Sequence, residues 1–414
     1  MSTPASPDGD AVAIALDAWR RGETGAALDR LDAAARAGDG AALEALLQLS
    51  GQDGAPGDAE ERILETVLAF PAGPVRNRHL AFLTAAGRGC KADPDAALAL
   101  RAADAASGGD TAALTELGLL ALMAGDDHAA RYRLETAAGR GGGHAIAALL
   151  RLGAERGAVA PVARQHGPAL ARAGHPLAGM LMQAVAGLPD AEPAGAPDEA
   201  ATRPEALAEA LCDAHIGDGR MLSETPRVAR HDGVLPAAVC DYLAAGGVPF
   251  LQPARIFDPE TGESRPDPYR TSLTAALPDS AMDLVLWAIK LRMAQLAGAG
   301  FAQGEPLSLL VYRPGEEYRA HFDFMTEDGG RASADLARRG QRIATSLVKL
   351  NDEHAGGATR FPRLDIAWTG RRGDALSFAN VDASGQGDKR TLHAGEPVTS
   401  GMKVLASLWL RERA

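Results

Sequence analysis

Glycines recur at a nearly constant spacing through the N-terminal part of the chain, and this spacing limits the possible folds more than any other feature. The turns in which they occur lie near Gly38, Gly73, Gly109, Gly141 and Gly174, so the intervals between successive turns are almost equal. Alanine and leucine recur at helical spacing between the turns, as at 96–100 and 112–117. A period of roughly 34 residues indicates helix–turn–helix units stacked into a solenoid, with glycine supplying left-handed helix ends.

The amino-acid composition and the sequence pattern change after this segment, and the change predicts the domain organisation. Residues 188–204 contain four prolines among acidic residues and alanines, as an extended linker would. We therefore expect an α-helical repeat domain at 1–187, a linker at 188–204 and a second domain at 205–414. The second domain begins with helical runs at 205–214, 237–245 and 281–297. Its strand-like runs lie at 307–312, 343–348, 374–378 and 404–410. Because Gly, Pro and Asp bound these runs, they predict an antiparallel jelly roll with flanking helices.

Bulk composition excludes several classes of function. The formal net charge of −12 argues against a nucleic-acid partner, whose phosphates would be repelled. The three cysteines, Cys90, Cys212 and Cys240, are too few and too widely spaced for a disulfide framework or a zinc cluster. No stretch approaches the roughly 20 apolar residues that cross a bilayer. We expect a cytoplasmic protein without a membrane partner.

Three residues have the side chains of a mononuclear Fe(II) site. His321 and Asp323 are two residues apart, so an extended segment would direct both to one face. His393 lies much further along the chain, and a jelly roll can bring such distant strands together. Two imidazoles and one carboxylate leave one face of the metal open for a co-substrate and O₂. A His-x-Asp pair alone is usually a surface pair or a simple hydrogen-bonded couple, so the interpretation depends on its context.

Lys403 supplies that context, ten residues after His393. A lysine at the start of an apolar strand is costly to bury unless its charge is paired. The remote carboxylate of 2-oxoglutarate would pair it, whereas a lysine at a strand end that reaches solvent is the simpler alternative.

The second domain resembles the catalytic domain of the prolyl 4-hydroxylase family of 2-oxoglutarate/Fe(II) oxygenases over residues 225–413. The matching segments are 270–272, 310–324, 341–345, 350–352, 356–362, 371–378 and 393–403. The second of these contains the family's Tyr–Gly–Tyr–His-x-Asp pattern, as Tyr312, Gly315, Tyr318, His321 and Asp323. The glycine- and alanine-rich first domain resembles Sel-type tetratricopeptide-like repeats.

The resemblance implies hydroxylation of a C–H bond, with a prolyl residue in a peptide or protein as the expected substrate. It implies Fe(II) as cofactor and 2-oxoglutarate and O₂ as co-substrates, with ascorbate as a candidate addition. His321, Asp323 and His393 would be the iron ligands and catalytic residues, and Lys403 would bind the far carboxylate of 2-oxoglutarate. Tyr312 would offer its hydroxyl to the co-substrate and Thr345 would line its pocket; ordinary strand packing is the alternative for both.

Two positions of this chain differ from the family pattern, and one loop beside the predicted iron site has a distinctive composition. Lys349 stands where the family usually has tyrosine, and Val404 where it often has tryptophan. The first places a second cation near the co-substrate or on the substrate side, and the second is a packing change. The charged and glycine-containing loop at 326–340 is expected to cover the substrate, with an idle surface loop as the alternative.

Other functions remain open at this stage. The same scaffold could oxidise a free amino acid, another side chain or a natural-product peptide. A protein of another class would use the repeats as an adaptor for a protein partner and carry an inert oxygenase domain. The intact His, Asp, His and Lys set argues against an inert domain. Because solenoids present long concave surfaces, the repeats are expected to recruit the substrate or a partner.

Overall fold

A computed structural model describes residues 7–50, 58–107, 109–196, 204–212, 219–257, 264–266, 269–326 and 331–414. Contacts divide the chain into two compact units. The first comprises Met1–Arg140, Gly195–Cys212 and Pro278–Trp287, and the second Gly141–Ala194, Asp213–Leu277 and Ala288–Ala414. The domain boundaries at 187 and 205, which follow sequence composition rather than contacts, stay a prediction. Residues 197–203 of the predicted linker lie outside the described residues.

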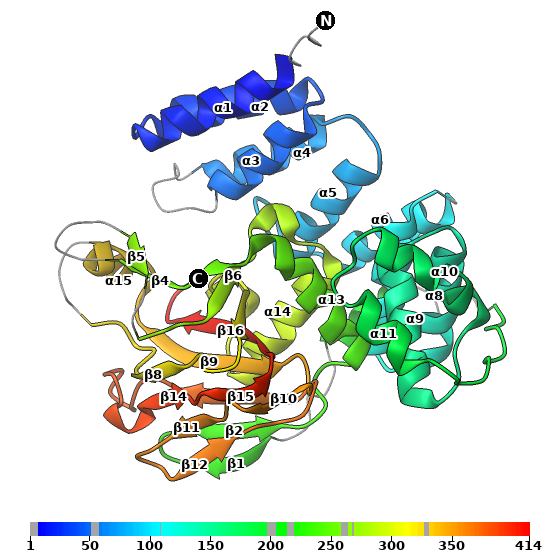
Figure 1. Ribbon diagram of the computed structural model, residues 1–414. Helices are drawn as coiled ribbons and strands as arrows, with labels where there is room; N and C mark the ends of the chain where they lie inside the picture. Colours follow the sequence, from blue (N-terminus) through cyan, green and yellow to red (C-terminus); the bar gives the residue numbers. More distant parts are fainter. Residues whose placement is uncertain are drawn as a thin grey trace, which may run out of the picture. The chain divides into compact units, whose positions relative to one another are not determined.

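The first unit is a stack of helices in which each packs on the next along the chain, from α1 to α8 (Figure 1). Their bounds are α1 (Pro7–Arg20), α2 (Thr24–Arg36), α3 (Gly40–Ser50), α4 (Ala59–Ala69), α5 (Pro74–Ala86), α6 (Pro94–Ala106), α7 (Thr111–Met123) and α8 (Asp127–Gly139). α12 (Pro204–Cys212) packs on α6 and α7. This nearest-neighbour packing is that of the predicted solenoid.

Local sequence explains where these helices begin and how closely they pack. The side chains of Asp93, Asp110 and Asp126 accept hydrogen bonds from backbone N–H groups at the N-termini of α6, α7 and α8, respectively. Gly118 of α7 lies against Leu134 of α8, where an added Cβ would be only 2.8 Å from the Leu134 Cγ atom. A glycine is therefore required for these two helices to approach so closely.

The periodic glycines do not all occupy equivalent positions. Gly38, Gly141 and Gly174 follow the ends of helices with φ of 100°, 85° and 72°, as predicted for left-handed helix ends. Gly73 and Gly109 instead precede α5 and α7. The expectation of helix ends was wrong at these two positions, because a turn between helices can place its glycine at either end.

The second unit combines helices with antiparallel sheets. Its helices are α9 (Gly143–Arg156), α10 (Pro161–Arg172), α11 (Ala178–Ala184), α13 (Ala237–Gly247), the second part of α14 (Leu284–Leu296) and α15 (Arg331–Arg339). Its strands form a larger and a smaller sheet. β10 (His354–Gly356) pairs with β15 (Val398–Gly401), and β4 (Arg255–Phe257) with β5 (Ser264–Pro266). Among the described helices of the chain, none has the length and apolar character to span a membrane.

From β7 onward the chain passes several times between the two sheets. The larger sheet contains β1 (Arg220–Ser223), β2 (Val228–His231), β3 (Gln252–Pro253), β6 (Leu273–Ala276), β7 (Ser308–Tyr312), β9 (Arg342–Lys349), β13 (Ala375–Ala379) and β16 (Lys403–Arg411). The smaller contains β8 (Tyr318–His321), β11 (Thr359–Phe361), β12 (Ile366–Trp368) and β14 (His393–Gly395). The strands of the larger sheet lie in the order β1-β2-β13-β9-β16-β7-β6-β3, and those of the smaller sheet in the order β12-β11-β14-β8. Both sheets are antiparallel, as predicted, and their arrangement as a double-stranded β-helix stays a prediction. All four strand-like runs of the sequence form strands of the larger sheet.

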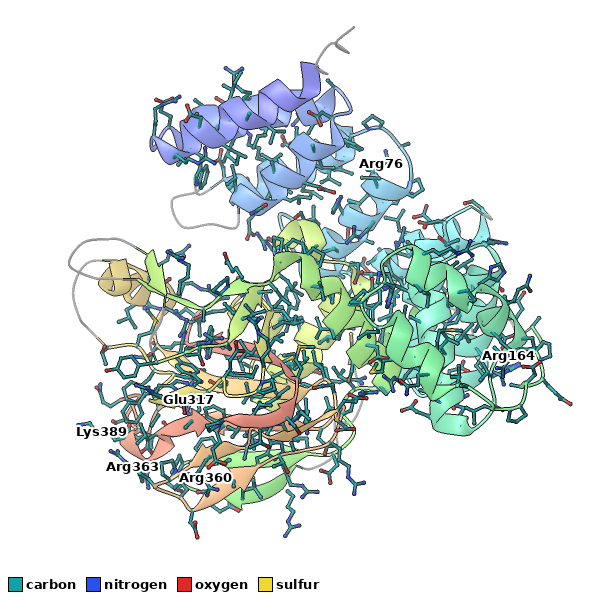
Figure 2. The ribbon with its side chains drawn as sticks, in the orientation of Figure 1. Arg76, Arg164, Glu317, Arg360, Arg363 and Lys389 are labelled. Atoms are coloured by element: carbon teal, nitrogen blue, oxygen red, sulfur yellow. The ribbon has the colours of Figure 1, made fainter. Side chains whose placement is uncertain are left out.

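Apolar side chains from both sheets meet to form the core of the β-sheet region. Phe361 of the smaller sheet and Phe378 of the larger are both fully buried, with ring centroids 5.0 Å apart in an edge-to-face contact. Val228, Leu376 and Trp368 belong to the same cluster. Charged side chains such as Arg360, Arg363 and Lys389 are exposed and point outward from this region (Figure 2). The two sheets therefore enclose a buried apolar interior.

The segment predicted as a loop at 326–340 contains a helix. α15 covers Arg331–Arg339, and residues 327–330 lie outside the described residues. Arg411 of β16 donates to the carbonyl oxygen of Gly340 at 2.7 Å and pairs with the Asp335 carboxylate at 2.8 Å. The segment was thus wrongly predicted to lack regular structure, because its helical pattern is short and highly charged. Its role as a cover over the substrate stays a prediction.

Candidate metal and co-substrate site

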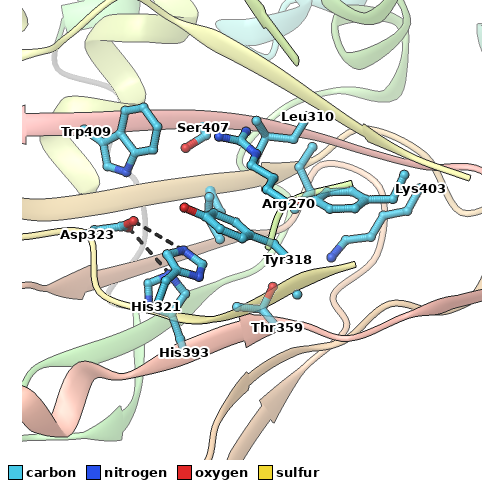
Figure 3. A pocket seen from close by; sticks show the side chains of 14 residues that line it. Arg270, Leu310, Tyr318, His321, Asp323, Thr359, His393, Lys403, Ser407 and Trp409 are labelled. Atoms are coloured by element: carbon cyan, nitrogen blue, oxygen red, sulfur yellow. Dashed lines mark ion pairs between the residues drawn. The ribbon is translucent and has the colours of Figure 1, made fainter. Parts of the chain in front are cut away.

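Paired strands bring together the three residues predicted to bind metal. His321 ends β8, His393 begins β14, and the two are direct partners in the antiparallel register. Asp323 follows β8 by two residues. The Nε2 atoms of His321 and His393 lie 3.6 Å from Asp323 Oδ1 and Oδ2, respectively (Figure 3). One potential ligand atom from each residue lies within 4.8 Å of the others, so a single ion could be bound by all three.

Backbone carbonyls set the orientation of both imidazoles. His321 Nδ1 lies 2.8 Å from the carbonyl oxygen of Arg319, and His393 Nδ1 lies 3.0 Å from that of Thr391. Because a carbonyl oxygen only accepts, each Nδ1 must carry the proton and donate it. Each Nε2 is then left with its lone pair directed at the Asp323 side. This arrangement is typical of metal-binding histidines, whose second nitrogen is held by a neighbouring acceptor.

A hydrogen-bond chain fixes the carboxylate ligand. The Thr345 hydroxyl donates to Asp323 Oδ2 at 2.7 Å, and the Asn380 amide donates to the Thr345 oxygen at 2.9 Å. All three residues are buried. Thr345 therefore orients a predicted metal ligand. It is not among the residues that line the cavity at this site, and its predicted place in the wall of the co-substrate pocket stays a prediction. Asn380 was missed in the sequence, where the only signal was a polar residue directly after an apolar strand.

The protonation states also suit a cation. Burial, opposed by Asp323, lowers the pKa of His393 to about 4, so its imidazole is neutral at pH 7. Burial alone would raise the pKa of Asp323, but His393, His321 and Thr345 hold it well below its usual range. A carboxylate between two imidazole nitrogens gives the donor set a negative charge for a divalent ion. This set of two imidazoles and one carboxylate fits Fe(II).

A cavity connects this donor set to Lys403. It is lined by Arg270, Leu310, Tyr312, Tyr318, His321, Asp323, Leu347, Thr359, His393, Gly395, Lys403, Leu405, Ser407 and Trp409. Figure 3 shows the His–Asp–His group at one end, Lys403 toward the other, and Tyr318 between them. Alternate residues of β16 face the cavity, because successive strand residues point to opposite faces.

Lys403 presents a buried amine at its end of the cavity. Its side chain is 3% exposed, and its Nζ atom donates to the Gly357 carbonyl oxygen at 2.5 Å. Burial and the nearby Lys349 lower the pKa of Lys403 to about 7, with Glu396 opposing them. Within the described part of the chain, no carboxylate lies within ion-pair distance of Lys403. An anionic group in the cavity would therefore supply the negative partner that the Lys403 ammonium group lacks among the described residues.

Two further residues contribute to the cavity wall. Tyr312 is the cross-strand partner of Lys403, whose Nζ lies 5.3 Å from the centre of the Tyr312 ring. Burial raises the pKa of the Tyr312 hydroxyl, so it is protonated and able to donate. Its predicted bond to the co-substrate stays a prediction. Arg270, part of one matching segment of the sequence, extends over the ring of Tyr318, with its guanidinium carbon 5.0 Å from the ring centroid.

Replacing Thr345 with valine is expected to weaken metal binding about 10- to 100-fold, because the Asp323 carboxylate loses the group that orients it. The change also removes the acceptor of the Asn380 amide, costing about 1–3 kcal/mol of stability. Anaerobic titration with Fe(II) measures the affinity. Ser346→Ala is the matched control, since Ser346 is buried and its hydroxyl donates to the Met293 carbonyl oxygen at 2.6 Å. Equal metal affinity in Thr345→Val and parent would contradict this role.

Comparison with known proteins agrees with the geometry. A family model described as the 2OG-Fe(II) oxygenase superfamily matches residues 307–411. Prolyl 4-hydroxylase 1 of Arabidopsis thaliana is 32% identical over 209 residues, covering 47% of this chain and 72% of that protein. The chain belongs to the prolyl 4-hydroxylase family of 2-oxoglutarate/Fe(II) oxygenases. The matched region contains all three predicted iron ligands and Lys403, so the sequence resemblance and the geometry concern the same residues.

Other members of the family match a smaller share of their length. Prolyl 4-hydroxylase subunit alpha-1 of Rattus norvegicus is 36% identical over 190 residues, which are 46% of this chain but 35% of the subunit. The chain thus spans about a third of the length of these subunits. A viral collagen prolyl hydroxylase from Paramecium Bursaria Chlorella virus-1, solved with 2-oxoglutarate, is 25% identical. The match covers 44% of this chain and 95% of the viral one, with a TM-score of 0.35.

Membership defines the small molecules of the site. Enzymes of this family use Fe(II) as cofactor and 2-oxoglutarate and O₂ as co-substrates. His321, Asp323 and His393 would hold the iron, and the cavity between it and Lys403 would hold 2-oxoglutarate. The donor set and the buried amine at opposite ends of one cavity fit these two ligands.

Proposed function

We propose that the protein is a 2-oxoglutarate- and Fe(II)-dependent dioxygenase that hydroxylates a C–H bond of a prolyl residue in a peptide or protein. The observation that carries the proposal is a single cavity with a His–Asp–His donor set at one end and a buried lysine toward the other. Bound iron would supply the redox chemistry that couples decarboxylation of 2-oxoglutarate to insertion of an oxygen atom into the substrate.

The residues of the chain hold the reactants in place. His321, Asp323 and His393 occupy one side of the ion and leave the other side to the co-substrates. Lys403 binds the remote carboxylate of 2-oxoglutarate, which orients the oxo acid along the cavity. Leu310, Leu347 and Leu405 line the walls and limit the access of water.

The choice of a prolyl substrate is supported by the names of the relatives, which are prolyl 4-hydroxylases. A free amino acid, another side chain or a natural-product peptide is the alternative on the same scaffold. We also propose that the stacked helices of the first unit recruit the substrate or a protein partner. A role for ascorbate, a cytoplasmic location and the absence of nucleic-acid and membrane partners stay predictions.

Incubation with Fe(II), 2-oxoglutarate and a library of proline-containing peptides tests the proposal. We expect succinate and hydroxylated peptide in equal amounts, with a mass increase of one oxygen atom located on a proline by fragmentation. Free amino acids and proline-free peptides serve as controls. Oxygen insertion at another side chain would replace the prolyl assignment by the alternative. A protein that bound neither Fe(II) nor 2-oxoglutarate would overturn the proposal itself, and the inert oxygenase domain of an adaptor would then be the better interpretation.

A further inference from the structure

Two buried lysines lie close together at one end of the cavity. Lys349 of β9 is 5% exposed and Lys403 of β16 is 3% exposed. Leu405 is the cross-strand partner of Lys349, and Lys403 is two residues from Leu405 on the same strand. Because alternate residues share a face, the two lysines are diagonal neighbours on the inner face of the larger sheet. Side chains in this relation remain near enough for their charges to interact strongly in a protein interior.

The Lys349 ammonium group is held outside the cavity by groups of the chain. Its Nζ atom donates to the Gly370 carbonyl oxygen at 3.2 Å and lies 3.8 Å from Asp352 Oδ1. The Asp352 side chain is 53% exposed, so solvent screens much of its charge. Burial lowers the pKa of Lys349 more than Asp352, Asp374 and Glu353 raise it, so these carboxylates compensate the buried charge only in part. Lys349 is therefore fixed beside the co-substrate end of the cavity.

Neighbouring groups do not remove this positive field. His354 on β10 has two buried ring nitrogens that find no hydrogen-bond partner among the described residues. Burial, Lys349 and Lys403 all lower the pKa of His354, so its ring is neutral at pH 7. Glu396 raises the pKa of Lys403 but lies beyond ion-pair distance from it, and its own carboxylate is paired with Arg360. Tyr312, which also lies beside Lys403, is protonated and uncharged.

We propose that Lys349 is a specificity-determining residue of the co-substrate pocket, which favours oxo acids with a second carboxylate through its charge rather than by direct contact. The inference rests on the proposed function, because it assigns 2-oxoglutarate to this cavity. In the free site the two ammonium groups repel each other. A bound carboxylate relieves that repulsion and is attracted by both groups, so each lysine strengthens its binding. Where the family usually has an uncharged tyrosine, this chain would thus add the field of a second cation to the direct contact that Lys403 makes with the remote carboxylate.

Calorimetric titration of the anaerobic, Mn(II)-loaded full-length protein tests the inference without requiring turnover. The probes are 2-oxoglutarate and 2-oxopentanoate, which has the same chain length but a methyl group in place of the remote carboxylate. At pH 6, below the Lys403 pKa of about 7, Lys403 is mostly protonated. Lys349→Met is expected to weaken 2-oxoglutarate binding on the order of tenfold. Its affinity for 2-oxopentanoate should equal that of the parent.

Matched variants separate charge from packing. Lys349→Arg keeps the charge and should retain most of the parent affinity for 2-oxoglutarate. Lys349→Gln is a second neutral variant, and Lys389→Met removes an exposed lysine and should change nothing. Unchanged or tighter 2-oxoglutarate binding in both neutral variants would overturn the inference, as would an arginine variant as weak as the neutral ones. If the parent itself bound no 2-oxoglutarate, the proposed function would fail, and not the role of Lys349 alone.

Discussion

Replacing Asp323 with alanine is expected to abolish 2-oxoglutarate turnover while the protein remains folded. Loss of a group that merely orients a metal ligand costs about 10- to 100-fold, so loss of the ligand itself should reduce turnover to about 1% or less. The fold should persist because the removed charge is buried and interacts mainly with the other site residues. Succinate production, iron stoichiometry and thermal unfolding measure the three effects.

Asp365→Asn is the control for this experiment. Asp365 is exposed and has a φ of 53°, a conformation that asparagine tolerates well. The control should retain parental turnover and iron content. Parental succinate production by Asp323→Ala would disprove the assignment of the iron site, whatever its thermal stability.

Replacing Lys403 with methionine is expected to raise the 2-oxoglutarate KM on the order of 100-fold, because the remote carboxylate would be left without its buried partner. Methionine has a similar length, so the wall of the cavity should keep its shape. Thermal stability should be equal or higher, since the parent buries a cation that no described carboxylate pairs. Steady-state kinetics at varied 2-oxoglutarate and a thermal melt provide the measurements.

Lys389→Met is the matched control, because it also removes a lysine but at an exposed position outside the cavity (Figure 2). Its KM should equal that of the parent. A Lys403→Met enzyme with a parental KM would show that another cation binds the remote carboxylate. Arg270, which also lines the cavity, would then be the first residue to change.

The positions of the strands could be predicted because each depends on local pattern, whereas His321, Asp323 and His393 were indicated as iron ligands by the family resemblance, and the structure brings these three residues together. The run at 343–348 became β9, and the run at 404–410 became β16. The Asn380–Thr345–Asp323 chain could not be foreseen, because it joins three segments whose register is set only by the folded sheets. The same holds for Lys349, whose contact with Gly370 depends on a distant turn.

The glycine period and the charged segment show where pattern was insufficient. Equal spacing predicted the stack of helices, but it did not distinguish Gly73, before a helix, from Gly38, after one. α15 was missed because an isolated nine-residue helix has little intrinsic stability and depends on tertiary contacts. Arg411, at the end of β16, supplies such contacts to Asp335 and Gly340.

The direct pairing of His321 with His393 links the chemistry of the protein to the accuracy of its folding. A shift of one residue between β8 and β14 would turn one imidazole to the outside of the smaller sheet and leave the ion with an incomplete set of donors. Only chains with the native alignment could then bind the ion tightly. Since a ligand that binds the native state stabilises it, iron binding would stabilise correctly aligned molecules relative to misaligned ones.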